Sequence, residues 1–469
     1  FEYCGANISW YIPHRIKEGY SLQTDHILMS VDRNIDLIIT VDCGVSSHEA
    51  VDLAKKEDID VIITDHHEPE TKLPNAVAVI DPKRDDCLAG LNYLAGVGVA
   101  FYLVMALRKY FRQQAFWKDL DEPNLKNYLD LFAIGTIGDM VPLVKENRLL
   151  CIAGLEIIRR GRRLGLKSLA LTSRIDLKKL DSDDISFKIV PRINAAGRIS
   201  HARICVSQLT SPDIITAEQT ASLLDQLNVK RQKIEQEIVE DIENRLSLSP
   251  GLLDARLLFL WNNQWDPSVL GIAASKLSRK YSRPVILLSA QDDLAIGSGR
   301  SINNINIYQA LKAHDSNLEK FGGHAMACGL TVKTKNLPLL SERLNDYMML
   351  NISKDSFYKT LTIDAVLDFH EINYALACEI NRLRPFGVAN PEPVFLCRDA
   401  TVFSSYIIGG SHRKMILGKK GNPRSENVEA FQFNVPDPDE QPNFFNEIAF
   451  KLKINKFKPN AAQMILEHF

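Results

Sequence analysis

The chain has 469 residues, 45% of them hydrophobic and 24% charged, and its formal net charge at pH 7 is −2. This length exceeds what one hydrophobic core usually organises, so we expect two to four domains. The composition excludes a largely disordered chain. The charge excludes a globally basic nucleic-acid binder, because any affinity for DNA would have to come from local basic patches.

The first predicted element is a parallel β-α-β unit. Residues 35–41 and 60–64 are nearly continuous apolar runs, as in strands covered on both faces, and residues 46–57 have the spacing of an amphipathic helix. Ligands of such sheets bind beyond the carboxyl ends of the strands. Asp42 and Asp65 directly follow the two strands, so we expect their carboxylates to lie at this edge of the sheet.

Helical patterns follow this unit. Residues 91–107 are the most membrane-like segment, but the run is slightly short and contains Asn92, so we expect a buried helix. Residues 125–137 also have a helical pattern. In residues 216–246 apolar side chains recur at multiples of three to four residues, which predicts a long helix that connects two domains.

A second α/β unit is predicted next. Strands near residues 257–261 and 285–289 flank a helix at 271–281, and the unit is expected to end near Val332. The last hundred residues change character, with short alternating stretches separated by Gly, Pro and Asn. This pattern is typical of a small β-barrel. The alternating stretches are residues 400–403, 428–433 and 448–452.

The eight cysteines are scattered without the paired spacing of a zinc site or of a dense disulfide framework. No charged-then-apolar signal segment opens the sequence. Both features favour a cytoplasmic protein in a reducing compartment.

Acidic and imidazole side chains gather in three short motifs: VDCG at residues 41–44, TDHH at 64–67 and GTIGD at 135–139. Carboxylates and imidazoles bind divalent metal ions, and a shared carboxylate can hold two ions about 4 Å apart. Taken alone, an Asp at a strand end often caps the following helix, and a His-His pair is often part of a surface loop. Two acidic strand ends in one unit, the second followed by paired histidines, favour the metal site.

Asp65-His66-His67 resembles the signature of the DHH phosphoesterase superfamily, and the surrounding sequence is similar to the RecJ family of single-stranded-DNA exonucleases. The motifs that carry this resemblance follow the family's order along almost the whole chain. They are YIPHR at residues 11–15 with EGY at 18–20, GTIGDMVPL at 135–143, PRINAAGR at 191–198, GSGRS at 297–301 and FGGH at 321–324.

The resemblance implies an α/β protein of four parts. A DHH-type parallel-sheet domain would occupy residues 1–205, a long connecting helix 206–250, a second α/β domain of DHHA1 type 251–350, and an OB-like β-barrel 351–469. Relatives also carry an earlier strand with an Asp-rich end that supplies further metal ligands. We expect that strand to precede Phe1, so these residues would hold part of the metal site.

The implied activity is 5′-to-3′ hydrolysis of single-stranded DNA to 5′-mononucleotides with two divalent ions, Mn²⁺ or Mg²⁺. By resemblance Asp42 would bridge the two ions, and His66 and Asp139 would bind them. His67 would face the scissile phosphate, and Asp65 would orient the histidines. The implied partners are single-stranded DNA, a single-strand-binding protein and a helicase, with no membrane, and the protein is expected to be a monomer.

Arg192, Asn194 and Arg198 lie in a short polar stretch with an Ala-Ala-Gly break, which suits a loop that carries guanidinium groups toward a phosphate. A surface salt-bridge loop is the alternative. The resemblance favours stabilisation of transition-state charge by these residues.

Ser298, Arg300 and Ser301 are interleaved with glycines, which lets backbone amides approach an anion while the guanidinium supplies charge. A plain turn fits the glycines equally well. The resemblance assigns these residues, together with Arg15, to the terminal 5′ phosphate, and makes His324 a candidate phosphate contact.

In the predicted barrel, basic residues beside aromatic ones could follow a single strand, although a solvated charged hairpin fits the sequence as well. The candidates are Arg413, Lys414, Lys419 and Lys420 beside Phe403 and Tyr406.

One segment departs from the family pattern. Residues 265–269 read WDPSV, where relatives usually place a His and a Gly, and this puts a local contact of the second domain in doubt. Two other functions stay open. One is a DHH enzyme for short oligonucleotides or cyclic dinucleotides, and the other is a non-catalytic RecJ-like protein that binds single strands.

Overall fold

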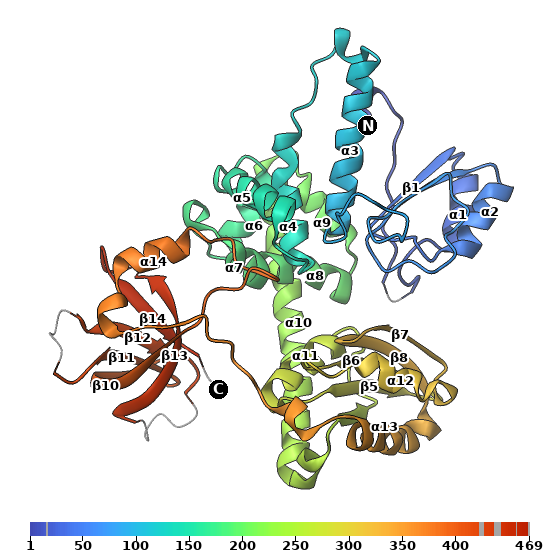
Figure 1. Ribbon diagram of the computed structural model, residues 1–469. Helices are drawn as coiled ribbons and strands as arrows, with labels where there is room; N and C mark the ends of the chain where they lie inside the picture. The colour runs from blue at the N-terminus through green and yellow to red at the C-terminus, as the bar shows by residue number, and fades with distance from the viewer. Residues whose placement is uncertain (16, 422–425, 436–441, 456, 468–469) are drawn as a thin grey trace. The chain divides into compact units, whose positions relative to one another are not determined.

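The computed structural model describes residues 1–15, 17–421, 426–435, 442–455 and 457–467 (Figure 1). Its contacts divide the chain into two compact units, each built from three segments. Unit 1 comprises Phe1–Tyr20, Arg163–Asp176 and Lys188–Lys359, and unit 2 comprises Ser21–Arg162, Leu177–Phe187 and Thr360–Phe469. Among the helices in the described ranges, none is both long and apolar enough to cross a membrane.

Unit 2 contains the predicted parallel β-α-β unit. Strands β1 (Leu37–Val41), β2 (Asp60–Thr64) and β3 (Ala78–Ile80) form a parallel sheet in the order β1-β2-β3. Helices α1 (Thr24–Asp32) and α2 (His48–Lys56) cover it with apolar side chains. Val41, Thr64 and Ile80 are register partners, so the residues that follow the three strands lie at one edge.

Three longer helices complete this part of unit 2: α3 (Gly96–Gln113), α4 (Leu129–Gly138) and α5 (Lys145–Arg159). The prediction of a buried helix at 91–107 is wrong for most of α3, which buries only Gly96, Gly98 and Val99. The helix contacts α4, β1 and β2, and its buried residues all lie in its first turn. The short elements are η2 (Phe116–Lys118), η3 (Leu125–Tyr128), η4 (Leu177–Lys179) and α7 (Ser182–Asp184).

The predicted C-terminal barrel is present in unit 2. Its strands pair in the order β11-β12-β14-β13-β10, and β10 also pairs with β11, which closes the barrel around Cys397, Met415 and Phe450. The elements are β9 (Ala365–Val366), η10 (Phe369–Glu371), α14 (Tyr374–Asn381), β10 (Phe395–Ile408), β11 (His412–Gly418), β12 (Val428–Gln432), β13 (Phe444–Ile454) and β14 (Ala462–Leu466). Helix α14 packs against β13.

Unit 1 is organised by the predicted long helix, α10 (Ile214–Leu248), which runs along the unit in Figure 1. Packed on its N-terminal part are α6 (Leu164–Thr172), α8 (Val190–Ile199) and α9 (Arg203–Leu209). The π-helical segment η5 (Ile185–Ile189) leads into α8.

The other half of unit 1 is a mixed sheet in the order β4-β5-β6-β8-β7, parallel only between β4 and β5. Helices α10 and α11 cover one face, and α12 and α13 cover the other. The strands are β4 (Leu258–Asn262), β5 (Val285–Gln291), β6 (Leu294–Arg300), β7 (Lys320–His324) and β8 (Ala327–Lys333). The helices are α11 (Leu270–Tyr281), α12 (Ile307–Lys312) and α13 (Leu337–Asn351), with short turns η1 (Glu2–Cys4), η6 (Pro250–Asp254), η7 (Asp315–Asn317), η8 (Thr334–Asn336) and η9 (Lys354–Phe357).

Local predictions are wrong at three places in unit 1: the loop around Arg192 to Arg198, the end of the unit near Val332, and the glycine-rich loop with Ser298 and Arg300. The expected loop around Arg192 to Arg198 is helix α8, because Pro191 fits the first turn and Ala195 and Ala196 are buried. The expected end of the unit near Val332 is too early, because α13 buries apolar side chains against the sheet.

The expected glycine-rich loop with Ser298 and Arg300 is strand β6. Its glycines allow close packing rather than a turn. A Cβ on Gly297 would lie 2.5 Å from the carbonyl oxygen of Leu287, and one on Gly299 would lie 2.4 Å from Cys328 Sγ. The two polar side chains therefore alternate with the glycines along an extended strand.

Candidate functional site

The strand ends of unit 2 bring together the predicted metal ligands. His66 Nε2 lies 3.0 Å from Asp42 Oδ1 and 3.5 Å from Asp139 Oδ2. Asp42, His66 and His67 each offer one ligand atom, and these atoms all lie within 4.8 Å of one another. Donor atoms at this separation can share one ion, because bonds from divalent metals to nitrogen and oxygen are about 2.0–2.2 Å long. The residues therefore fit a divalent metal ion.

The backbone around Asp42 is shaped to present this carboxylate. Asp42 has φ +65°, in the left-handed region that non-glycine residues rarely adopt, and its N–H donates to the carbonyl oxygen of Thr64 at 2.9 Å. Gly96, the first residue of α3, lies so close that a Cβ there would be 2.3 Å from Asp42 Oδ1. The carboxylate thus contacts a helix N-terminus, which stabilises negative charge. Sequence reasoning missed Gly96, because the contact spans more than fifty residues.

Asp65 is the buried support of the two histidines, with only 1% of its surface exposed. Its Oδ1 lies 2.7 Å from His67 Nδ1 and accepts from the N–H of His66 at 2.8 Å, and its Oδ2 accepts from the N–H of Val45 at 3.0 Å. Burial alone would raise the pKa of Asp65, but the hydrogen bonds from these groups outweigh it and lower the pKa. The His67 ring is therefore held at Nδ1, and 55% of its side-chain surface is exposed.

The side chains of this candidate metal site influence one another's pKa values. A hydrogen bond to Asp42 raises the pKa of His66 against the effect of burial, and a hydrogen bond to Asp65 does the same for His67. Burial is the main cause that raises the pKa of Asp139. The carboxylate beside each imidazole therefore favours the protonated form of that imidazole.

Asp81 is an acidic residue of this edge that sequence reasoning missed. It follows β3, just as Asp42 and Asp65 follow β1 and β2, and it is 3% exposed. One carboxylate oxygen accepts from the N–H of Lys83 at 2.8 Å, while Oδ2 is buried without a partner among the described residues. Burial raises the pKa of Asp81. The sequence does contain this third strand end. A strand of three residues, however, is too short for its apolar pattern to be recognised.

Unit 1 gathers the predicted phosphate ligands Arg15, Arg198 and Arg300. Burial lowers the pKa of Arg198 to about 10, with a further contribution from repulsion by Arg15 and Arg300, and burial lowers the pKa of Arg300 as well. Arg198 Nη1 donates to the carbonyl oxygen of Ser268 at 2.9 Å, and Arg300 Nη1 to that of Gly299 at 2.7 Å. Both partners are neutral, so the three guanidinium groups form a positive cluster.

The N-terminus of α11 borders this cluster. A Cβ on Gly271, in the first turn of α11, would lie 2.8 Å from Arg300 Nη2 and 3.5 Å from Ser298 Oγ. Helix N-termini favour anions, so this placement adds to the positive potential. His324 pairs with Ala327, which pairs with Arg300, so His324 and Arg300 share a register row and a face of the sheet.

Two other predicted residues, Arg192 and Ser301, have partners within the protein, whereas Asn194 is exposed. Arg192 forms an ion pair with Asp225 at 2.8 Å and donates to the carbonyl oxygen of Lys188, as in the salt-bridge alternative. Asn194 is exposed on α8. Ser301 is buried, and its hydroxyl donates to the carbonyl oxygen of Ile305 at 2.7 Å, which supports the turn after β6.

The WDPSV segment at residues 265–269, where the chain departs from the family pattern, forms a local turn. Asp266 Oδ1 accepts from the N–H of Ser268 at 2.9 Å and from its hydroxyl at 2.6 Å. Ser268 in turn accepts the hydrogen bond from Arg198. The aspartate thus fixes the turn that positions Arg198.

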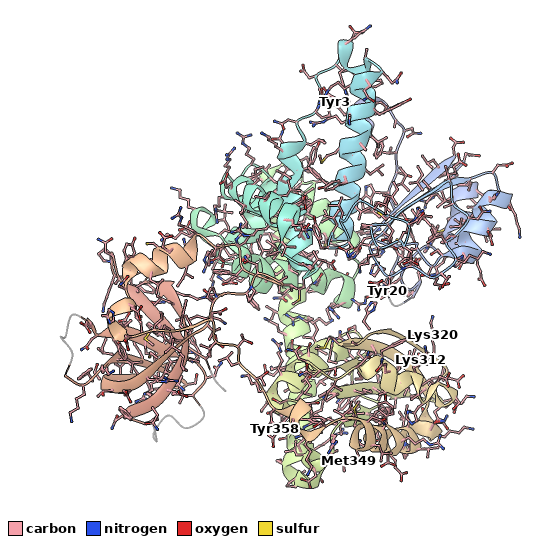
Figure 2. The ribbon with its side chains drawn as sticks, in the orientation of Figure 1. Tyr3, Tyr20, Lys312, Lys320, Met349 and Tyr358 are labelled. Atoms are coloured by element: carbon pink, nitrogen blue, oxygen red, sulfur yellow. The ribbon has the colours of Figure 1, made fainter. Side chains whose placement is uncertain are left out.

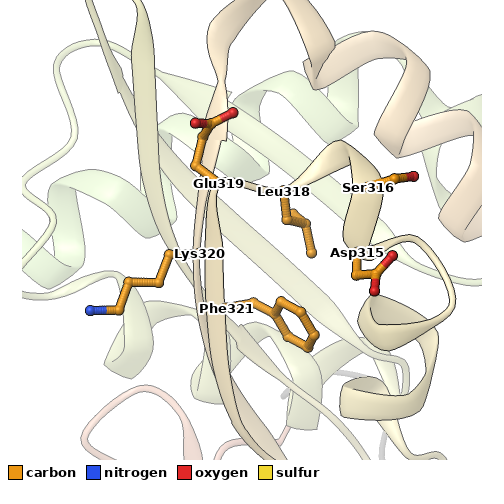
Figure 3. Close-up of a pocket in the computed structure, with 6 residues that line it drawn as sticks. All are labelled: Asp315, Ser316, Leu318, Glu319, Lys320 and Phe321. Atoms are coloured by element: carbon orange, nitrogen blue, oxygen red, sulfur yellow. The ribbon is translucent and has the colours of Figure 1, made fainter.

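A separate hollow of about 480 Å³ in unit 1 is not part of the arginine cluster (Figure 3). Asp315, Ser316, Leu318, Glu319, Lys320 and Phe321 line it. It carries charges of both signs and lies beside the edge strand β7, from which Lys320 projects (Figure 2). The hollow therefore lacks the single sign of charge that a phosphate site needs.

The predicted basic face of the barrel is smaller than expected. Arg413 is only 1% exposed, which contradicts its proposed contact with a strand, because β11 turns it into the protein, where it donates to the carbonyl oxygen of Pro442. Lys414 pairs with Glu429 at 2.7 Å. Phe403 and Tyr406 are half exposed and remain available for stacking.

Three family models match the chain. The DHH family N-terminal domain matches residues 1–136, the DHHA1 domain 254–350, and the RecJ OB domain 363–468. These matches confirm the predicted order of a DHH-type domain, a DHHA1-like domain and an OB-like barrel.

Curated relatives carry the name single-stranded-DNA-specific exonuclease RecJ. The protein of Bacillus subtilis is 38% identical over 88% of this chain, and that of Dickeya dadantii is 35% identical over 99%. The chain spans about half (51%) of the B. subtilis relative and 82% of the D. dadantii relative.

Solved structures are similar as well. The RecJ of Thermus thermophilus in complex with Mn²⁺ has a TM-score of 0.78 at 27% identity, covering 95% of this chain and 63% of that one. The same protein with Mg²⁺ has a TM-score of 0.71 at 27% identity, covering 92% and 61%. The sequence, the order of domains and the fold agree, and the chain belongs to the RecJ family of single-stranded-DNA-specific exonucleases.

Proposed function

We propose that the protein hydrolyses single-stranded DNA from its 5′ end to 5′-mononucleotides with two divalent metal ions, Mn²⁺ or Mg²⁺. The observation that carries this proposal is the cluster of Asp42, His66 and His67, with Asp139 beside it. The membership of the RecJ family and the metal-bound relatives support it. The barrel argues against an enzyme restricted to dinucleotides, and the retained donors argue against a non-catalytic protein.

In this proposal Asp42, His66 and Asp139 would hold the metal ions, and Asp42 would be the ligand shared by both. Bound divalent ions polarise the phosphate and lower the pKa of a bound water. His66 must be neutral at Nε2 to bind a metal, which couples its occupancy to pH. His67, held at Nδ1 by Asp65, presents its exposed Nε2 to the scissile phosphate.

The terminal 5′ phosphate binds, in this proposal, to the arginine cluster of unit 1. The buried guanidinium groups of Arg198 and Arg300 donate to backbone carbonyl oxygens, and such groups gain most from an anion that can accept several hydrogen bonds. Arg15, Arg198, Arg300 and Ser298 supply these donors, and His324 shares their face of the sheet. Arg192 and Asn194 remain proposed contacts for transition-state charge, as does Ser301 for the phosphate.

Family membership also supports proposals about DNA binding by the barrel, protein partners and compartment. Exposed Phe403 and Tyr406 on the barrel would stack on bases without sequence preference. A helicase and a single-strand-binding protein are the proposed partners, because they produce and cover the strand that this activity consumes. The eight cysteines are free thiols, which supports a reducing compartment such as the cytoplasm, and we propose a monomer there.

Digestion of 5′-phosphorylated single-stranded DNA over a manganese titration tests the proposal. Asp42→Ala should lower kcat/KM by at least about a hundredfold, since it removes a ligand from the proposed bridge. Asp52→Ala is the matched control, because Asp52 is exposed on α2 and away from the donors. Undiminished cleavage by Asp42→Ala would end the proposed role of this carboxylate.

A further inference from the structure

Asp139 stands at the C-terminal end of α4 and is followed by a turn, residues 140–144, that leads into α5. Met140 in this turn has φ +60°. No helix or strand includes the turn, so its position depends on side chains and backbone groups from elsewhere. The position of the Asp139 carboxylate depends on the same contacts.

A loop that belongs to the barrel region packs on this turn. Residues 382–390 lie in the connection from α14 to β10, more than two hundred residues from this turn in sequence. The N–H of Leu143 donates to the carbonyl oxygen of Val388 at 2.7 Å. The approach is close, because a Cβ on Gly387 would lie 2.6 Å from Leu143 Cδ1.

The opposite side of the turn is also fixed. Asn147, which is fully buried, donates through Nδ2 to the carbonyl oxygens of Pro142 at 3.0 Å and Tyr93 at 2.7 Å. Leu143 itself is 2% exposed. The turn is therefore held between Asn147 and the 382–390 loop.

The loop is anchored by four polar contacts to the helical part of unit 2. Arg148 Nη2 on α5 donates to the carbonyl oxygens of Leu383 at 3.0 Å and Arg384 at 3.1 Å. The hydroxyl of Ser182 donates to the carbonyl oxygen of Phe386 at 2.9 Å. Arg384 also pairs with Asp181 at 2.6 Å.

We propose that residues 382–390 form a clasp that positions Asp139 at the metal centre. Among the described residues, no side chain of the clasp forms a hydrogen bond or an ion pair with Asp42, His66 or Asp139. The clasp therefore acts through Leu143 and Arg148, as a positioning element and not as a set of ligands. The inference rests on the proposed function, which supplies the metal ion. It makes the affinity for that ion depend on a loop that precedes the first long strand of the barrel, β10.

Two variants of the full-length chain test the clasp. Arg148→Met keeps the apolar stem of the side chain but removes the donors to the clasp. Gly387→Ala leaves every donor in place and pushes Leu143 away. Arg382→Met is the matched control, because the Arg382 side chain is 76% exposed and pairs with Glu379 on α14.

The measurements are the Mn²⁺ dissociation constant without DNA, by electron paramagnetic resonance, and the hydrogen exchange of the Leu143 amide in metal-free protein. Both test variants should weaken Mn²⁺ binding about 10- to 100-fold, as loss of supporting contacts around ligands typically does. Arg148→Met should also speed exchange at Leu143. Arg382→Met should match the wild type in both measurements, and Arg148→Lys should restore part of the affinity.

Wild-type Mn²⁺ affinity in both Arg148→Met and Gly387→Ala would overturn the proposal, whatever their melting temperatures. If Arg148→Met fails to fold, Gly387→Ala decides alone. Wild-type chain that binds Mn²⁺ but leaves single-stranded DNA intact would refute the proposed function and leave the clasp standing. Active variants with unchanged affinity would refute the clasp and leave the function standing.

Discussion

Gly96→Ala is expected to damage the metal centre without harming the fold. The added Cβ would lie 2.3 Å from Asp42 Oδ1 and 2.5 Å from Asp42 Cγ, whereas real Cβ atoms essentially never approach closer than 3.0 Å. The carboxylate must therefore move by about 0.7 Å, the difference between 3.0 and 2.3 Å. Since a misplacement of about 1 Å can cost about a hundredfold in rate, kcat/KM should fall roughly 30- to 100-fold.

Gly98→Ala is the matched control on the same helix. Its Cβ would meet only the Leu94 side chain, at 3.2 Å from Cδ2, which can adjust. Alanine is about 0.5–1 kcal/mol more favourable than glycine inside a helix, so this variant should keep activity and unfold no more easily than the wild type. Kinetics on single-stranded DNA, Mn²⁺ affinity and urea unfolding are measured together. Wild-type Mn²⁺ affinity and activity in Gly96→Ala would refute the inferred contact with Asp42.

Two further predictions concern the arginine cluster and the support of the histidines. Arg300→Ala should raise KM for 5′-phosphorylated single-stranded DNA about tenfold or more and leave the 5′-hydroxyl strand unaffected, since hydrogen bonds to charged groups contribute about 1.5–3 kcal/mol. Arg279→Ala, exposed on α11, is its control, and equal effects on both substrates would contradict the phosphate role. The lowered pKa of Asp65 means that its ionised form stabilises the fold above the ordinary value of 3.8, and that this contribution is lost as pH falls through the folded pKa. Asp65→Asn should therefore lower the free energy of unfolding at pH 7 and flatten its decline below about pH 4, and an unchanged urea-denaturation profile would count against this reasoning.

Several elements could be predicted from local pattern alone. Strand β2 was predicted with its observed bounds, and the long helix α10 within two residues at either end. Strand β2 is a nearly continuous apolar run and α10 has a helical apolar period, and both patterns can be recognised within the segment itself. The proposed metal donors Asp42 and His66 can also be placed at one edge of the sheet from the sequence, because both follow parallel strands.

Other features lay beyond local pattern, because distant contacts decide them. The sequence predicts a loop where the structure has helix α8, because this helix packs on α10, which is not its neighbour in sequence. Arg413 was expected on the surface, but the closure of the barrel buries it. Asp81 follows a strand of three residues, which is too short for its period to be read.

The order of the elements and the chemistry of the donors can be predicted from the amino-acid sequence, because apolar pattern and residue type are local properties of the chain. Which donors meet, and what holds them in place, depends on contacts between distant elements. Gly96 reaches Asp42 across the fold, and the loop at Gly387 packs against Leu143 from more than two hundred residues away. Such contacts depend on the packing of whole elements, which no short stretch of sequence encodes.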